Sequence, residues 1–165
     1  MPDQRQHRGP HPRDESLFGV QFHAVLREAA VHFAWLLERG YSSDAALKLV
    51  GDHFSLTVRQ RQALQRGTCG DAARAQRLAR RILPPEVANR VLLVDGFNVL
   101  ISIEAALSGG LVLIGRDGVH RDLASVHGTY RAVSETPKAI EQWIAATCAL
   151  APASVHVYLD APVSN

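Results

Sequence analysis

The segment Val91–Asp95, with the sequence Val-Leu-Leu-Val-Asp, constrains the fold of this chain more than any other. Four apolar residues run without a break into an aspartate, and a glycine follows. An unbroken apolar run of this length is typical of a strand buried on both faces, as in a parallel sheet. Residues 155–160, Val-His-Val-Tyr-Leu-Asp, repeat the pattern. Because the intervening segment is long enough for a crossover, the sequence predicts two parallel strands that each end in a carboxylate.

Helical periodicity dominates the chain before the first of these strands. Apolar residues between 18 and 37 recur on one helical face, and Gly40 stands where a C-terminal cap belongs. Three further helices are predicted, the first capped by Ser43 and the last by Asp71. The middle one opens at Thr57, which has a glutamine three residues later and so forms a capping box. The first half of the chain is therefore predicted to be all-helical with short connections.

A proline pair at 84–85 marks the change to a different pattern. The elements predicted after it are strands near 91–95, 111–114 and 155–159, with helices near 98–107 and 135–150. This alternation is typical of an α/β domain with a mainly parallel sheet. We therefore predict three regions: a disordered tail over 1–15, an all-α helical module over 16–85 and an α/β domain over 88–165.

Composition restricts the possible classes of protein. The chain has 165 residues, of which 47% are hydrophobic and 21% charged, as in soluble globular proteins. No apolar run approaches the roughly 18 residues of a membrane span, and two cysteines cannot form a disulfide framework. We expect a cytoplasmic protein without a membrane partner. Glycine-rich phosphate loops are missing from the sequence, so no nucleotide cofactor is expected. The sequence leaves the oligomeric state open.

Charge is distributed unevenly along the chain. Residues 1–90 carry 14 Lys and Arg against 9 Asp and Glu, whereas residues 91–165 carry 4 against 7. A basic half before an acidic half suits a module that faces RNA or another nucleic acid, joined to a carboxylate site; an ordinary asymmetry is an equally good interpretation. The arginines that could contact phosphate are Arg59, Arg61, Arg66, Arg74, Arg77, Arg80, Arg81 and Arg121. The alternative is a solvated face that packs against the acidic half.

The two strand-terminal aspartates are the strongest candidates for chemistry. Mg²⁺ and Mn²⁺ prefer carboxylate oxygens, and Asp95 and Asp160 would meet if their strands were neighbours. Taken singly, the first could be a helix cap and the second a turn residue. Glu104, in the following helix, could point back at the strand ends or face solvent. Asn98 could orient Asp95 by a hydrogen bond or cap the helix.

Several motifs resemble a known prokaryotic family. They are "WLLERGYSSDAALKLVGDHF", "VDGFNVLISIEAALSGG", "GRDGVHRDLASVHGTYR" and "YLDAPVSN". Nearly the whole chain, from about His11, resembles a domain of unknown function, DUF434, followed by a second uncharacterised domain. The second part is similar to the PIN and NYN nuclease-like superfamily, whose first strand often ends in a DGxN motif.

The resemblance to PIN and NYN domains implies a three-layer α/β fold and a metal site. It implies that Asp95 is a metal ligand, that Asp160 is the aspartate of a later strand, and that Glu104 and Asp122 join them by motif position. Such domains continue beyond the YLDAPVSN motif, so the resemblance also implies a domain truncated at its C-terminus and a site that lacks some of its ligands.

The leading hypothesis from the sequence is a Mg²⁺- or Mn²⁺-dependent nuclease that acts on RNA. The first alternative is a non-catalytic nucleic-acid-binding or regulatory module with a degenerate site. The second is a helix-turn-helix DNA binder built from the second and third predicted helices. Against it, the predicted connection over 51–56 is longer than the usual turn of three or four residues.

Overall fold

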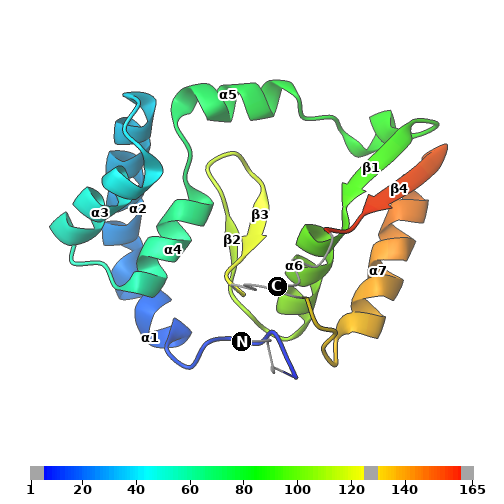
Figure 1. The fold of residues 1–165 in the computed structure, drawn as a ribbon, viewed down its shortest axis with the longest axis horizontal. Helices are drawn as coiled ribbons and strands as arrows, with labels where there is room; N and C mark the ends of the chain where they lie inside the picture. Colours follow the sequence, from blue (N-terminus) through cyan, green and yellow to red (C-terminus); the bar gives the residue numbers. More distant parts are fainter. Residues whose placement is uncertain (1–5, 125–129, 161–165) are drawn as a thin grey trace. The chain divides into compact units, whose positions relative to one another are not determined.

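The chain forms two units whose segments alternate along the sequence (Figure 1). The computed structural model describes residues 6–124 and 130–160. The helical unit consists of His11–Arg81 and Leu113–Leu123. The α/β unit consists of residues 6–10, Ile82–Val112 and the described residues from 124 onward. The change of unit at 81–82 lies close to the predicted boundary at 84–85, but each unit also contains a short segment from the other side of it.

The helical unit is built mainly from five helices. They are α1 (Asp14–Phe18), α2 (Val20–Glu38), α3 (Ser43–His53), α4 (Val58–Gly67) and α5 (Asp71–Ala79). Two short strands, β2 (Val112–Ile114) and β3 (His120–Asp122), pair with each other, and we call them the β2–β3 hairpin. The sequence predicted β2 as a member of the α/β sheet and did not predict β3. This prediction was wrong, because within the described residues β2 pairs with β3 alone.

The helix ends follow from local capping chemistry. The capping box of Thr57 and Gln60 at the start of α4 is confirmed, and Gly40, at a φ of 80°, follows the end of α2. Two other caps lie one residue earlier than predicted. The Ser42 hydroxyl accepts a hydrogen bond from the backbone N–H of Ala45 and so caps α3. Gly70 occupies the N-cap position of α5. Capping chemistry therefore locates these helix starts to within one residue.

A single apolar cluster joins three of the helices. Its buried members are Ala29, Phe33, Leu36, Ala46, Val50, Leu56 and Leu64, from α2, α3, α4 and the turn between the last two. Its members from α2, namely Ala29, Phe33 and Leu36, lie on the face that the apolar periodicity of residues 18–37 indicates. Although α2 has 19 residues, none of the helices in the described part of the chain is apolar enough to cross a membrane.

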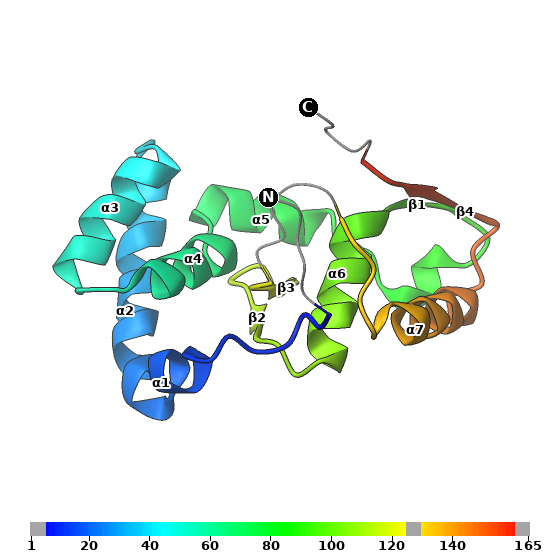
Figure 2. The ribbon, with the colours of Figure 1, turned by 60° about the horizontal axis from the view of Figure 1, so that its bottom comes forward.

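The α/β unit contains one parallel pair of strands. Its elements are the 3-10 helix η1 (Pro84–Val87), β1 (Val91–Asp95), α6 (Gly96–Leu107), α7 (Thr136–Ala149) and β4 (Ser154–Tyr158). The predicted parallel pairing of the two strands is confirmed, with Asp95 opposite Tyr158. Helices α6 and α7 lie on the same side of the pair (Figures 1 and 2). The protein is thus a mixed α and β protein, and the described residues place two strands in this sheet.

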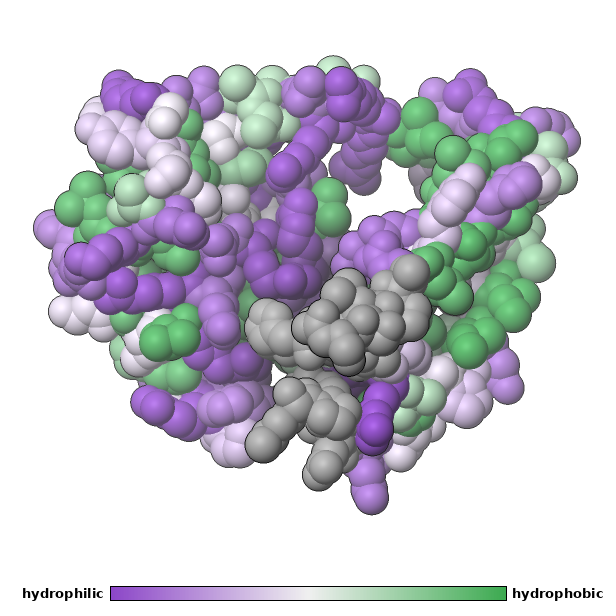
Figure 3. Space-filling view, in the orientation of Figure 1, coloured by the Kyte–Doolittle hydropathy of each residue, from purple (hydrophilic) through white to green (hydrophobic). Residues whose placement is uncertain are grey.

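The strand pair is much less buried than its sequence predicts. In β1, exposed and half-buried residues alternate, and every residue of β4 is exposed. The side chains of Val91 and Leu93 are 60% and 63% exposed. Figure 3 shows apolar side chains on the surface around these strands and α7. The prediction of a strand buried on both faces was wrong, because helices cover only one face of this two-stranded sheet.

Candidate functional site

The parallel pairing brings the two predicted aspartates to the same end of the sheet. Asp95 is the last residue of β1 and lies opposite Tyr158, the last residue of β4. Asp160 follows Tyr158 by two residues, and both aspartates are exposed. In open α/β sheets, ligands bind beyond the carboxyl ends of the strands. Both residues therefore lie at the end of the strand pair where open α/β sheets bind ligands.

Asn98 holds the Asp95 carboxylate from the first turn of α6. Its side-chain amide donates to Oδ2 at 2.6 Å, and its backbone N–H donates to Oδ1 at 3.3 Å. Asp95 is therefore the N-cap of α6. Asn98 orients the Asp95 carboxylate and does not cap the helix itself, so the first of the two interpretations of Asn98 holds. A carboxylate has about four lone-pair sites, so each oxygen keeps an acceptor site for a further ligand.

Gly96 allows β4 to approach the start of α6. A Cβ atom at this position would lie 2.5 Å from Leu159 Cδ2, 2.7 Å from Val157 Cγ1 and 3.0 Å from the Tyr158 carbonyl oxygen. Two of these atoms belong to side chains that could rotate, but the third is backbone. The close contact thus connects the residue after Asp95 directly to the segment that leads to Asp160.

Replacing Gly96 with alanine is expected to destabilise the α/β unit by about 1–3 kcal/mol, because the new methyl group must push β4 away. Thermal unfolding followed by the fluorescence of Trp143, which lies in α7, measures the effect in a Trp35→Phe background. The matched control is Gly67→Ala, since a Cβ there meets only Leu113 Cδ1 at 3.9 Å. Equal thermal midpoints for the Gly96→Ala protein and the wild type would contradict the expected clash.

Glu104 is bonded within a buried cluster of side chains. It is fully buried, and its Oε2 accepts from Arg8 Nε at 2.5 Å. Its Oε1 accepts from the hydroxyls of Tyr130 at 2.6 Å and Thr136 at 2.5 Å. The Arg8 guanidinium also donates to the Arg131 carbonyl at 2.7 Å. We call these side chains the Glu104 cluster, and they tie the segment before α1, helix α6 and the start of α7 together.

The Glu104 cluster also perturbs a tyrosine. Burial and the hydrogen bond to Glu104 both raise the pKa of Tyr130 above its ordinary value. The ring of Tyr130 stacks on Phe97 at 4.7 Å between centroids, and the Arg8 guanidinium lies 5.1 Å from the Tyr130 centroid. The sequence did not indicate Arg8, because it lies among polar residues and prolines without any apolar period.

Asp122 lies in the helical unit, in β3, with its side chain buried. Its carboxylate is 3.6 Å from the Arg66 guanidinium of α4. The neighbouring hairpin carboxylate, Asp117, contacts Arg77 of α5 and Arg121, each at 2.7 Å. The hydrogen bond from Arg121 holds the pKa of Asp117 far below its ordinary value; it outweighs burial, and Arg77 assists it. Hairpin acids and helix arginines thus form an internal ion-pair network.

Most of the predicted phosphate-contacting arginines bond within the helical unit. Arg59 pairs with Asp14, its Nη2 lying 2.8 Å from the carboxylate, and Arg61 pairs with Asp52 at 2.8 Å. Arg74 donates to the Arg116 carbonyl at 2.9 Å. The arginine-rich face is therefore in large part a paired surface. It matches the alternative interpretation only in part, because Arg59 and Arg61 pair with acids of the first half of the chain and not of the acidic half. Arg80 and Arg81 are exposed after the end of α5.

The connection between α3 and α4 is shorter than the sequence predicted. Helix α3 continues to His53, so residues 54–57 form a four-residue turn, with Ser55 at a φ of 51°. This length matches the usual helix-turn-helix connection, and the objection from a long connection was wrong. In the second helix of this pair, however, Arg59 and Arg61 are both engaged in the ion pairs described above.

The candidate metal ligands at the strand ends are two carboxylates, which suits a cation that keeps most of its bound water. Among residues 6–124 and 130–160, no group of three or more His, Cys, Asp or Glu side chains could hold a metal ion. The strand ends offer the carboxylates of Asp95 and Asp160. Mg²⁺ is commonly bound by one or two carboxylates and keeps several waters, so this all-oxygen donor set suits Mg²⁺ or Mn²⁺. Glu104 and Asp122 are engaged elsewhere.

Comparison with known proteins identifies two matching domain families. The model of a protein of unknown function, DUF434, matches residues 25–91, and that of a domain of unknown function, DUF5616, matches residues 84–165. An uncharacterized protein of Methanocaldococcus jannaschii is 33% identical over 142 residues, which cover 85% of this chain and 67% of that protein. No solved structure matches the chain. The chain therefore belongs to the same family of unknown function as this archaeal protein, and it carries a DUF434 segment followed by a DUF5616 segment.

Proposed function

We propose that the carboxyl ends of β1 and β4 bind Mg²⁺ or Mn²⁺ and that the protein is a metal-dependent nuclease of PIN-like type that acts on RNA. The observation that supports this proposal is the parallel pairing of β1 with β4, because Asp95 ends β1 and Asp160 follows the end of β4 by two residues. Bound there, such a cation would activate water and stabilise negative charge on a phosphodiester.

The residues of the chain itself supply orientation. Asn98 fixes the Asp95 carboxylate through two hydrogen bonds, so that the group is held in one position before any ligand arrives. Exposure of both aspartates leaves room for a phosphate group and its waters. Within the described residues, Arg80 and Arg81 are the exposed cations of the predicted set whose side chains form neither an ion pair nor a hydrogen bond, whereas Arg74 donates to the Arg116 carbonyl. Arg80 and Arg81 are therefore the proposed phosphate contacts.

The test is the replacement of Asp95 with asparagine. Asparagine caps helices as well as aspartate does, so α6 should keep its start while the carboxylate charge is lost. We expect at least about a tenfold loss of Mn²⁺ affinity in calorimetric titration, because cation affinity depends on the number of charged ligands, together with loss of Mn²⁺-dependent RNA cleavage. Asp160→Asn should have the same effect. Glu141→Gln, an exposed change on α7, is the matched control.

Two results would count against the nuclease proposal. Unchanged Mn²⁺ affinity in both aspartate variants would show that the strand ends hold no cation. Failure of the wild-type protein to cleave RNA or DNA with any divalent ion, combined with salt-sensitive RNA binding, would favour the non-catalytic nucleic-acid-binding module instead. A loss of RNA binding in Arg80→Ala and Arg81→Ala would then identify the contacts of that module.

A further inference from the structure

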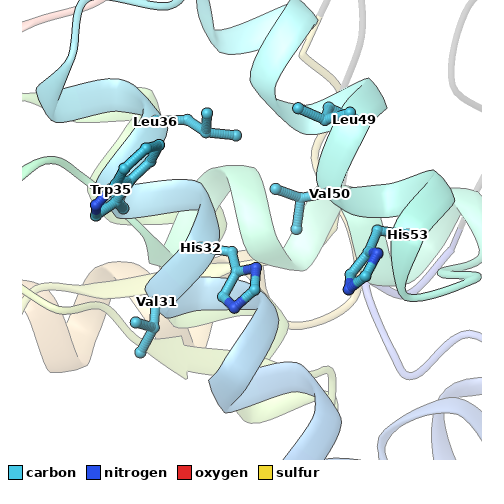
Figure 4. Close-up of a pocket in the computed structure, with 7 residues that line it drawn as sticks. All are labelled: Val31, His32, Trp35, Leu36, Leu49, Val50 and His53. Atoms are coloured by element: carbon cyan, nitrogen blue, oxygen red, sulfur yellow. The ribbon is translucent and has the colours of Figure 1, made fainter.

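Helices α2 and α3 enclose a pocket of about 550 Å³ in the helical unit (Figure 4). Its apolar lining consists of Val31, Trp35, Leu36, Leu49 and Val50. A volume of this size falls within the range typical of small-molecule sites, which are mostly apolar with a few polar groups. The exposed fractions of Val31, Trp35 and Leu49 are 63%, 53% and 58%, so the pocket opens directly to solvent.

Two imidazole rings provide the polar groups of the pocket. His32 and His53 also line it, with their centroids 5.9 Å apart and their planes within 16° of parallel. Phe54 packs edge-on against both rings and so limits their movement. Neither histidine has a hydrogen bond or ion pair with another residue of the described ranges. In Figure 4, Trp35 lies on the side of the pocket away from His53.

The lining of the pocket favours an anion. It includes no aspartate or glutamate, and its polar groups are the two imidazole rings. An imidazole offers at least one N–H donor whether it is neutral or protonated, and a carboxylate accepts from two donors at once. A carboxylate therefore complements the two rings better than a neutral group does.

We propose that this pocket binds a small aromatic carboxylic acid. The aromatic body packs against Trp35, Leu36 and Leu49, and the carboxylate accepts hydrogen bonds from His32 and His53. This site lies in the helical unit and is independent of the strand-end cation site. It gives the DUF434 segment a ligand-binding role of its own.

The experiment compares two probes with the same phenylpropyl skeleton, one ending in a carboxylate and the other in a neutral hydroxyl. The chain has two tryptophans, so Trp143→Phe leaves Trp35 as the fluorescent reporter at the pocket. Titration with 3-phenylpropionate should change the Trp35 emission saturably, with an affinity about tenfold higher than that of 3-phenylpropan-1-ol, because charged hydrogen bonds are stronger than neutral ones. The double variant His32→Leu with His53→Leu should bind the two probes equally. His23→Leu, on the same helix, should keep the preference for the acid.

Each contrary outcome overturns the proposal. Equal affinity of the two probes for the wild-type pocket would indicate a non-selective apolar surface. A preference for the acid that survives in the double leucine variant would place the carboxylate elsewhere. No saturable change with 3-phenylpropionate would exclude an aromatic acid as the ligand. If the double leucine variant does not fold, the single variants His32→Leu and His53→Leu should each reduce the preference for the acid, and an unchanged preference in both overturns the proposal.

Discussion

Replacing Arg8 with methionine is expected to lower the free energy of unfolding of the α/β unit by about 3–5 kcal/mol, because it leaves the fully buried Glu104 carboxylate without its counter-charge. The side chains of Arg8 and Glu104 are 1% and 0% exposed, so water cannot replace the lost partner. The remaining donors, the hydroxyls of Tyr130 and Thr136, carry no formal charge. The measurement is urea unfolding followed by Trp143 fluorescence in a Trp35→Phe background.

Two further variants separate loss of the ion pair from loss of packing. Arg131→Met removes an exposed guanidinium from the same neighbourhood and should change stability little, because the cluster uses the Arg131 carbonyl. The double variant Arg8→Met with Glu104→Leu removes both charges and should be more stable than Arg8→Met alone. If Arg8→Met lowers the free energy of unfolding by less than about 1 kcal/mol, which is the contribution typical of an exposed ion pair, the buried pair contributes little to stability.

Replacing Asp117 with asparagine is expected to destabilise the helical unit by about 2–3 kcal/mol at neutral pH, because two charge-assisted hydrogen bonds lose their charged acceptor. Arg77 and Arg121 both contact this carboxylate, and the Val119 N–H donates to it at 3.2 Å. Trp35 fluorescence in a Trp143→Phe background follows the unfolding of this unit. Asp44→Asn, an exposed acid in the first turn of α3, is the matched control.

The effect of Asp117→Asn should depend on pH in a defined direction. The folded-state pKa of Asp117 lies far below the ordinary value of 3.8. A carboxyl with a lowered folded-state pKa stabilises the protein fully above its unfolded-state pKa, and this contribution is lost as the pH falls below it. The stability difference between wild type and variant should therefore be constant from neutral pH to about pH 5 and then shrink as acid is added. A difference that grows in acid would contradict this assignment.

Features set by neighbouring residues were predictable from the sequence. The apolar run that ends in Asp95 predicted β1 and its pairing with β4, and the capping box at Thr57 located the start of α4. Each of these signals lies within a few residues of the element that it determines. The pairing needed one more argument, the crossover length, which follows from chain geometry.

Features that depend on distant partners were not predictable in this way. In the sequence, the arginines of α4 and α5 resemble a nucleic-acid-binding surface, because their ion-pair partners lie far along the chain. Asp117, for example, comes 40 residues after Arg77. Glu104 was equally compatible with solvent, because its counter-ion Arg8 is 96 residues away. Strand β3 has three residues, of which two are charged and none is strongly strand-forming, so no local signal marks it.

The β2–β3 hairpin belongs to the helical unit but is encoded between two segments of the α/β unit, and this order affects how the helical unit folds during synthesis. When residue 81 leaves the ribosome, all five helices of the helical unit have been translated. The ion-pair partners of Arg66 and Arg77, which are Asp122 and Asp117, have not. Those acids arrive only with residues 117–122, after β1 and α6 have been made. Because domains generally fold as units during synthesis, the nascent helical unit carries an unneutralised positive face through this interval. Its last folding step must therefore wait for part of the following segment to be translated.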